Sequence, residues 1–580
     1  MTVPRDLHRS PRLAALFCAG LLACARVADA SAAASAPAPN DPVREVDTFI
    51  GTQGEGNTFP GASAPFGLIQ VSPITGHYAG YRYDDPKIRG FGHSFLSGAG
   101  CWAQGGQVAV LPVTGSIGPG GDFDTSDPKA APFDYRSYAA PYTHDGEVGE
   151  AGYYRVRLLD AQGKAGGIEA EATALTRAAA ERYTFAPGTR TGRVLVNVGQ
   201  ANEKHEVVGS VVEVVGNRIV QGKLVTNSFC GGAQYTTWFR IEFDRPFKAF
   251  GTWDREGGVP GSRRSVGVQW DVANGAWLEF DLDGSHSITA TSAISHVDAE
   301  GARGNLEADG KRAGRLLGFD AMRAQAQAAW RKELSSVRVE GAGGADRAVF
   351  YTALYHALLQ PLTGSDADGR YRGYDDLVHR ADGWTYYEYF SLWDTYRSQN
   401  QLLAMLRPQR ARDIARSMLA IHEQMGWLPR WGYANFETNV MTGDPVTPWL
   451  VDLWRFGALQ GREREAWDAL WQNAGGRPPA MSRAQGRAGN DTYIADGYVP
   501  YDRAYPSKGM DADQHHGGSA TLEYALADCA LSQMAAGLGE GDAAATLRAR
   551  AGNWHRVWDP GVRDPSLDFT GFPRPRIEDG

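Results

Sequence analysis

The sequence predicts an α+β protein in which an N-terminal β-sandwich precedes a toroid of paired helices. Apolar residues alternate with polar ones in many short segments separated by turns, up to about residue 310. From about residue 316 the apolar period changes to 3.6 residues. Long polar loops rich in aromatic residues separate the predicted helices. Helical hairpins joined by such loops favour a toroid whose loops carry the function.

The first 30 residues have the pattern of a secretory signal peptide, with basic residues before a short apolar run and an Ala-Asp-Ala cleavage motif at 28–30. The segment 21–24 also resembles a bacterial lipoprotein box, which would leave a lipid anchor on Cys24. Residues 31–40 are rich in Ala, Ser and Pro and are expected to form a linker. We therefore expect export to the periplasm or the medium, with an outer-membrane lipoprotein as the alternative.

Residues 41–310 are predicted to form the sandwich domain. The segments 207–215 and 218–226 flank a Gly-Asn pair that is typical of a hairpin turn. The segment 235–243 alternates as a strand with one buried face does, and its expected core residues are Trp238, Ile241 and Phe243.

Residues 311–340 are predicted to form linking helices, and residues 341–580 the helical toroid. Gly426 follows one predicted helix at the C′ position, where glycine is favoured. The predicted helices are 321–333, 346–359, 391–405, 409–425, 447–459 and 520–536.

Charge and cysteine content exclude several classes of protein. The formal net charge is −9 and basic residues form no stripe, so nucleic acid is not an expected partner. No segment after the signal reaches the roughly 18 consecutive apolar residues of a membrane-spanning helix. Cys101, Cys230 and Cys529 form no Cys/His cluster, so no zinc site is expected, and the sequence does not choose a disulfide pair.

Two glycine-rich motifs in the sandwich segment are candidates for ligand contact. Residues 49–67 (FIGTQGEGNTFPGASAPFG) contain five glycines, so the backbone can turn tightly and approach a ligand, although a structural loop is the alternative. Residues 90–102 (GFGHSFLSGAGCW) end at Trp102, which is a candidate platform for a sugar ring. We expect His93 in the same motif to be a structural hydrogen-bonding residue.

A third motif, residues 390–397 (FSLWDTYR), combines a carboxylate with aromatic side chains. Asp394 lies between Trp393 and Tyr396, where it could accept hydrogen bonds from two adjacent sugar hydroxyls. The alternative role is structural, because Asp394 is also the third helical residue after a Ser391 N-cap and would favour the helix dipole.

These motifs, in this order, resemble glycoside hydrolase family 92, the exo-acting α-mannosidases of bacteria. The stretches SDADGRYRGYDD, GWLPRW and TLEYALADCAL also carry the resemblance, which covers about residues 46–580. The resemblance implies a β-sandwich packed against an (α/α)6 barrel, with the active site between them. It also implies calcium-dependent, inverting hydrolysis of α-mannosides, of α-1,2 type, in mannose-containing glycans.

The resemblance also assigns sugar-binding residues. Trp393 and Asp394 match the family's sugar-contacting pair. Trp102 matches a position linked to the aglycone side in members that prefer α-1,2 linkages. Glu55 and Phe59 lie in the glycine-rich segment that reaches the barrel in this family.

The resemblance leaves the catalytic groups and the calcium ligands unassigned. The family's general acid is a Glu in a segment that follows the stretch matching 572–580, and its base and calcium ligands come later still. Glu578 lies too close to Gly580 and the chain end to replace them. We therefore expect a barrel that is incomplete at its C-terminus, in a chain that is poorly stable or needs a partner fragment.

Three functions remain open. The first is an exported α-mannosidase by ancestry, with an incomplete active site in this chain. The second is a non-catalytic carbohydrate-binding protein that keeps Trp102 and Asp394. The third is a different (α/α)6 enzyme, similar to a glucoamylase or a phosphorylase, that uses Glu437 or Asp444 from the long loop 428–444. Glu437 is also a candidate substrate contact in the family reading.

Overall fold

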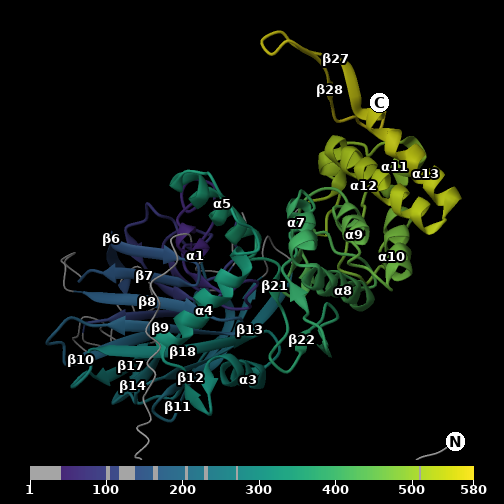
Figure 1. Cartoon of the computed structure of the whole chain (residues 1–580). Helices are drawn as coiled ribbons and strands as arrows, with labels where there is room; N and C mark the ends of the chain where they lie inside the picture. Colours follow the sequence, from purple (N-terminus) through teal and green to yellow (C-terminus); the bar gives the residue numbers. More distant parts are fainter. Residues whose placement is uncertain are drawn as a thin grey trace, which may run out of the picture. The chain divides into compact units, whose positions relative to one another are not determined.

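The computed structural model describes residues 41–98, 105–115, 138–160, 167–202, 207–227, 233–255, 257–268, 272–508 and 511–579 (Figure 1). The predicted signal peptide and linker lie outside the described residues, as do Trp102, Cys101 and Cys230. Across the described ranges, no helix is both long and apolar enough to cross a membrane.

Two antiparallel sheets form a sandwich in the N-terminal half, and both orders below refer to the described residues. The smaller sheet contains, in spatial order, β1 (Ala62–Ser63), β2 (Gln70–Ile74), β4 (Gly90–Gly92), β5 (Ala109–Val113), β10 (Thr191–Asn197), β17 (Gly275–Asp281), β14 (Ala249–Asp254) and β15 (Gly257–Pro260). The larger sheet contains β16 (Arg264–Val268), β11 (Val207–Val215), β12 (Ile219–Asn227), β13 (Gln234–Phe243), β18 (Ser287–Ser295), β9 (Ala178–Thr184), β8 (Ile168–Ala174), β7 (Tyr153–Leu158), β6 (Ala140–Glu150) and β3 (Lys87–Ile88).

The sheets bury one apolar core between them, to which strands of both contribute. The predicted hairpin is confirmed, since β11 and β12 pair in antiparallel fashion and Gly216 between them has φ 62°. In β13, Ile241 and Phe243 are buried as predicted. The core assignment of Trp238 is wrong, because residues of even and odd number in one strand face opposite sides of the sheet.

Helices dominate the rest of the chain (Figure 1). The α-helices of the described residues are α1 (Pro42–Glu45), α3 (Ala299–Asp309), α4 (Phe319–Leu334), α5 (Gly344–Ala357), α6 (Leu392–Thr395), α7 (Gln399–Leu406), α8 (Pro408–Met425), α9 (Val446–Arg455), α10 (Glu463–Gly475), α11 (Asn490–Asp496), α12 (Gly517–Leu538) and α13 (Gly541–Ala551). Two 3₁₀ helices, η1 (Asp513–His516) and η2 (Gly552–Val557), flank α12 and α13. The predicted order of a β-sandwich followed by a helical region is confirmed.

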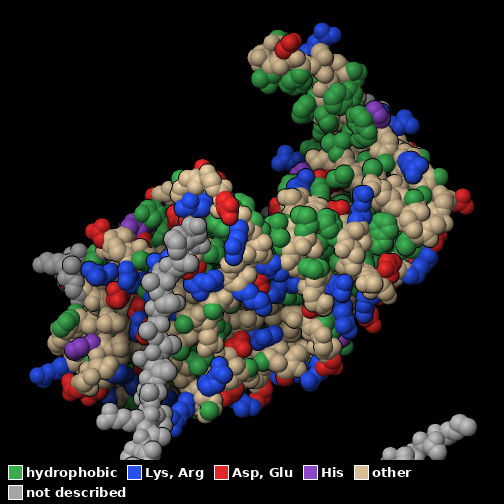
Figure 2. Space-filling model, in the orientation of Figure 1, with side chains coloured by type: hydrophobic (Ala, Val, Ile, Leu, Met, Phe, Trp, Pro, Cys, Tyr) green, Lys and Arg blue, Asp and Glu red, His purple; other side chains and the backbone are tan. Residues whose placement is uncertain are grey.

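Short two-stranded sheets lie in the loops between these helices, and one follows η2. They are β19 (Lys311–Arg312) with β20 (Arg315–Leu316), β21 (Leu362–Thr363) with β24 (Tyr387–Glu388), β22 (Arg370–Arg372) with β23 (Val378–Arg380), β25 (Gly432–Tyr433) with β26 (Phe436–Glu437), and β27 (Trp558–Asp564) with β28 (Phe569–Pro573). Figure 2 shows apolar side chains gathered over the β27–β28 hairpin.

The predicted helix 391–405 is wrong in one respect, because the chain forms two helices there. α6 ends at Thr395 and α7 begins at Gln399, and Ser398 between them has φ 87°. A non-glycine residue in that left-handed region interrupts a right-handed helix. The C′ prediction for Gly426 is confirmed, since its φ is 72° and its N–H bonds the His422 carbonyl.

The sandwich and the helices are joined by buried contacts. The Phe66 N–H donates to the Leu358 carbonyl at 2.9 Å, and the Thr363 N–H donates to the Phe66 carbonyl at 2.9 Å. The Trp330 indole N–H of α4 donates to the Ser63 carbonyl at 2.6 Å. One apolar core includes residues of the N-terminal segment together with those of α4 to α10, α12 and α13. The two halves therefore share part of their interior.

Candidate functional site

The Trp393–Asp394 pair lies on α6, a single helical turn that is anchored at its start. Phe390 and Gly432 exchange two backbone hydrogen bonds of 2.8 and 3.0 Å, which fix the chain where it enters α6. Leu392 is fully buried, whereas Trp393 is half-buried and Asp394 is exposed. Because Leu392 points inward, the pair lies on the accessible side of the turn.

Asp394 and Trp393 present complementary hydrogen-bonding groups. Asp394 Oδ2 accepts a hydrogen bond from the Ser391 hydroxyl, so Ser391 bonds this side chain and no backbone N–H of the helix. In the described part of the chain, Asp394 Oδ1 and the Trp393 indole N–H have no hydrogen-bond partner. A carboxylate oxygen accepts from sugar hydroxyls and an indole N–H donates to them. The pair can therefore bind a ligand rich in hydroxyls.

Arg397 and Glu523 flank this pair. The Arg397 guanidinium lies 4.2 Å from the Trp393 ring centre and 4.5 Å from the Tyr396 ring centre. Arg397 Nη2 lies 3.0 Å from Glu523 Oε1, and the Tyr396 hydroxyl donates to Glu523 Oε2 at 3.2 Å. Burial raises the pKa of the Glu523 carboxyl, while the Arg397 charge opposes that rise. Sequence reasoning missed Glu523, and the signal available was its place in the TLEYALADCAL motif.

Glu437 lies within the loop 428–444, and only 5% of the residue is exposed. Its carboxylate accepts hydrogen bonds from the backbone N–H groups of Arg430, Trp431 and Asn439. Burial raises the pKa of Glu437 to about 7, although these backbone donors oppose the rise. The carboxylate thus holds the tight turn of β25–β26 in the loop 428–444.

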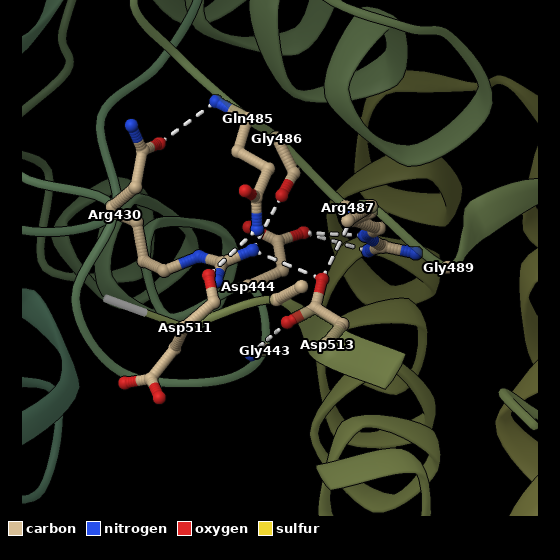
Figure 3. Close-up of polar contacts among 12 residues, drawn as sticks. Arg430, Gly443, Asp444, Gln485, Gly486, Arg487, Gly489, Asp511 and Asp513 are labelled. Atoms are coloured by element: carbon tan, nitrogen blue, oxygen red, sulfur yellow. Dashed lines mark hydrogen bonds and ion pairs between the residues drawn. The ribbon is translucent and has the colours of Figure 1, made fainter. Parts of the chain in front are cut away.

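Asp444 belongs to a buried ionic network (Figure 3). Asp444 Oδ2 accepts from the Thr447 hydroxyl at 2.7 Å and from Arg487 Nε at 2.8 Å. Arg487 also pairs with Asp528 at 2.8 Å, and its side chain is fully buried. Since every one of these groups has an opposite charge or a donor beside it, the network can stay ionised inside the protein. This arrangement supports a structural role for Asp444.

The network also holds the far end of the loop 428–444. Arg430 Nη2 lies 2.9 Å from Asp513 Oδ2, and Asp513 Oδ1 accepts from the Gly443 N–H at 3.1 Å (Figure 3). The Tyr524 hydroxyl of α12 donates to the same Asp513 carboxylate. One buried carboxylate therefore joins the loop to α12.

The glycine-rich motif 49–67 places its two candidates differently. Phe59 is 2% exposed and packs against Phe95 with ring centres 5.3 Å apart, so it is a core residue. Glu55 is exposed on the loop. The Gly98 N–H donates to the Asn57 carbonyl at 3.0 Å, which joins this loop to the segment that precedes Trp102. Trp102 itself lies outside the described residues.

His93 has the structural environment that the sequence predicts. Its ring is 1% exposed, with Nδ1 2.8 Å from the Val108 carbonyl and Nε2 3.2 Å from the Glu181 carboxylate. Both ring nitrogens are thus directed at protein atoms of the sandwich core.

The calcium ion that the resemblance implies needs several oxygen ligands in one place. Within the described ranges, no three His, Cys, Asp or Glu side chains gather closely enough to hold a metal ion. The residues around Trp393 do not by themselves fit a calcium cage, and no chemical step is assigned to the ion.

Comparison with known families identifies the class of protein to which this fold belongs. Residues 45–295 match the glycosyl hydrolase family 92 N-terminal domain, and residues 301–580 match the glycosyl hydrolase family 92 catalytic domain. The protein is thus a glycoside hydrolase by descent. The chain belongs to glycosyl hydrolase family 92, as its motifs predict.

Solved structures of the family have the same fold. A family GH92 α-mannosidase from Bacteroides thetaiotaomicron superposes with a TM-score of 0.78 at 27% identity, over 93% of this chain and 68% of that one. The same enzyme has also been solved in complex with mannoimidazole. A family GH92 inverting mannosidase from that organism has a TM-score of 0.78 at 24% identity, over 94% of this chain and 68% of its own.

A curated relative, described as an uncharacterized secreted glycosidase of Arthroderma benhamiae, is 22% identical over 93% of this chain and 66% of its own length. The chain therefore spans about two thirds of the length of the relatives it matches.

Proposed function

We propose that the protein is an exported glycoside hydrolase that acts on α-mannosides of mannose-containing glycans and binds the sugar at Trp393 and Asp394. The observation that carries the proposal is the exposed Asp394 carboxylate beside the Trp393 indole N–H, neither of them saturated by the described residues. Family membership supports the hydrolase. A relative that is named an α-mannosidase and binds mannoimidazole supports the sugar.

In this proposal Asp394 accepts hydrogen bonds from two neighbouring hydroxyls of mannose, and Trp393 donates to an oxygen of the same ring. A hydrogen bond to a charged group contributes about 1.5–3 kcal/mol. Trp102 and Glu55 are proposed as further sugar contacts, and the buried Phe59 and Glu437 as supports of the surrounding loops.

Inversion, α-1,2 preference and calcium dependence are parts of the proposal that rest on the family resemblance. Inverting hydrolysis needs an acid and a base roughly 6.5–9.5 Å apart, with water between the base and the sugar. No described residue is assigned to either role.

Export is proposed from the signal peptide and is supported by the secreted relative. Mass spectrometry of the exported chain checks it. An N-terminus at Ser31 would fit cleavage of the signal, a lipid-modified Cys24 would fit the outer-membrane alternative, and an unprocessed chain would contradict both.

Titration of methyl α-mannoside into residues 31–580 tests the sugar site. We expect Asp394→Asn to weaken binding by about tenfold or more. Its unfolding temperature should stay unchanged, because Asp394 is exposed. The matched control is Asp382→Asn, which alters an exposed carboxylate paired with Arg380 outside the site. Equal affinity of Asp394→Asn and the unaltered chain would contradict the site.

The same titration with methyl α-glucoside, the C2 epimer, checks sugar selectivity and should give weaker binding. Release of mannose from an α-mannoside substrate would support the hydrolytic part of the proposal. Binding without release, lost in Asp394→Asn, would favour the non-catalytic carbohydrate-binding protein.

A further inference from the structure

The helix α6, which carries the proposed sugar contacts, is too short to be stable without contacts to other parts of the chain. α6 has four residues, and helices of this length are unstable in isolation because nucleation is unfavourable. Ser398, three residues after the end of α6, has a left-handed backbone conformation, so α7 does not continue the helix. The orientation of Trp393 and Asp394 therefore depends on contacts made at the two ends of α6.

Glu523 supplies the contacts at the C-terminal end. Its Oε1 pairs with Arg397 at 3.0 Å and its Oε2 accepts from the Tyr396 hydroxyl at 3.2 Å. Arg397 Nε also donates to the Trp393 carbonyl at 3.1 Å, and its guanidinium covers the Trp393 ring. The carboxylate thus reaches the backbone and the ring of Trp393 through one side chain.

Glu523 is itself held by a rigid support. It lies in the second turn of α12, a helix of 22 residues. The neighbouring Thr521 hydroxyl bonds both the Gly517 carbonyl and the Val499 N–H, at 2.8 and 2.9 Å. The hydroxyl of the next residue, Tyr524, donates a hydrogen bond to the buried Asp513 carboxylate.

The backbone at Gly443 lies close to the Glu523 side chain. A Cβ added to Gly443 would lie 2.5 Å from the Glu523 Cβ, so only glycine leaves room for this side chain. Loop 428–444 therefore limits where the Glu523 side chain can go, and the loop is fixed in turn by Asp513.

We propose, resting on the proposed function, that Glu523 is a positioning residue of the sugar site: through Arg397 and Tyr396 it holds α6 so that Trp393 and Asp394 face the sugar. Both oxygens of Glu523 are engaged by protein donors, so its role is to orient and not to bind the sugar itself.

A double-mutant cycle on methyl α-mannoside affinity tests this role. Glu523→Gln keeps the size of the side chain and removes its charge. We expect Glu523→Gln and Arg397→Gln each to weaken binding by about tenfold. The double variant should also lose about tenfold and not about a hundredfold, because the two residues act through one contact. Additive losses would overturn the proposal.

Two further variants separate positioning from folding. Tyr396→Phe removes only the hydroxyl and should weaken binding by about threefold without altering the fold. Glu540→Gln removes the carboxylate of an exposed pair with Arg464 and should bind like the unaltered chain. Unchanged affinity in Glu523→Gln or in Tyr396→Phe would contradict the proposal.

The pH profile of binding gives a readout that a merely structural role would not move. Arg397, Tyr396 and Asp444 are the titratable groups that face Glu523. Because burial raises the pKa of Glu523 above its usual range, acidification should protonate Glu523, break its ion pair with Arg397 and weaken binding. In Glu523→Gln the acid-side loss should be smaller than in the unaltered chain, and a loss identical to that of the unaltered chain would count against the proposal.

The outcomes distinguish the two proposals. If the unaltered chain does not bind methyl α-mannoside, or Asp394→Asn binds it equally well, the proposed function fails. If Asp394→Asn weakens binding but the variants at 523 and 396 do not, only the role of Glu523 fails.

Discussion

His296 follows β18 and lies against Glu388 of β24, in the buried contact between the sandwich and the helical region. Its Nε2 is 3.4 Å from Glu388 Oε1, and both side chains are almost fully buried. Burial lowers the pKa of His296 to about 4. Burial, with the charge of Asp366, raises the pKa of Glu388 well above its usual range. Both shifts favour uncharged side chains at this contact.

We expect His296 to make stability depend on pH. The unfolded chain binds a proton at His296 near pH 6.5, whereas the folded chain does so only near 4. Its contribution is therefore complete above pH 6.5 and is lost as the pH falls toward 4, by about 3 kcal/mol. Urea denaturation across this range should show a shallower acid decline in His296→Gln.

The carboxyls at the same contact act in the opposite sense. Burial raises the pKa of Asp366 to about 6, so protonation stabilises the fold as the pH falls. The Asp366 contribution is common to both proteins, so it cancels when the free energies of unfolding of His296→Gln and of the unaltered chain are subtracted. A difference that does not vary between pH 6.5 and 4 would contradict the assignment of His296.

At the scale of single residues, the sequence predicted which side chains could bind a sugar but not how each is used. The sequence predicts Asp394 beside the rings of Trp393 and Tyr396, because residues close in sequence are also close in space on one helical turn. Glu437 also carries a carboxylate, yet its oxygens accept hydrogen bonds from three backbone N–H groups. Glu523 is over a hundred residues away from Arg397 in the chain, and no local pattern indicates that contact.

At the scale of elements, Gly443 of the loop 428–444 limits the space for the Glu523 side chain of α12. We expect Gly443→Ala to cost about 1–2 kcal/mol of stability, because its φ of 105° disfavours a side chain. It should also weaken methyl α-mannoside binding, since the added Cβ displaces Glu523. Calorimetric unfolding and sugar titration measure the two effects.

Gly426→Ala is the matched control for this substitution. Its φ is 72° and the added Cβ would meet only Pro479 Cγ, at 3.7 Å. We expect a similar loss of stability with unchanged sugar affinity. If both variants bind the sugar equally well, the loop does not control the position of Glu523.

Element prediction failed where tertiary contacts override local propensity. The helix predicted over 391–405 is divided because Ser398 adopts a left-handed conformation and Arg397 turns back to Glu523. α3 was not predicted, since Gly301, Gly304 and Asn305 weaken its helical signal, although Asp298 caps it. Strong signals, such as the hairpin of β11 and β12, were predicted with nearly correct bounds.

For the molecule as a whole, one exposed feature predicts association. The β27–β28 hairpin carries an apolar cluster in which Leu567 is 69% and Phe572 is 53% exposed (Figure 2). Contiguous exposed apolar surface favours binding to other apolar surfaces. We expect bright fluorescence of an apolar dye, reduced in the variant that carries Leu567→Ser and Phe572→Ser.

The control for the dye experiment is Met481→Ser, which removes an isolated and almost fully exposed apolar side chain. Its dye binding should match that of the unaltered chain. If the variant with Leu567→Ser and Phe572→Ser binds the dye as well as the unaltered chain does, the dye binds at another surface. Size-exclusion chromatography with light scattering then tests whether the hairpin causes self-association.

The overall order of a sandwich followed by helices was predictable because a change from period two to period 3.6 is visible in the sequence. The packing of one half against the other was predicted only through the family resemblance. Nothing in the local pattern places Phe66 between Leu358 and Thr363, nor Trp330 against Ser63. Such contacts depend on residues hundreds of positions apart.

The shared interior has a consequence for how the protein is made. Val43, Phe59 and Phe66 are encoded early, but the side chains that cover them in α4 and α5 include Trp330 and Leu354. Synthesis proceeds from the N-terminus, so the sandwich strands emerge well before their partners. During that interval the nascent chain exposes part of its future interior. Until α4 and α5 have been synthesised, these early side chains lack the apolar partners that they have in the folded chain.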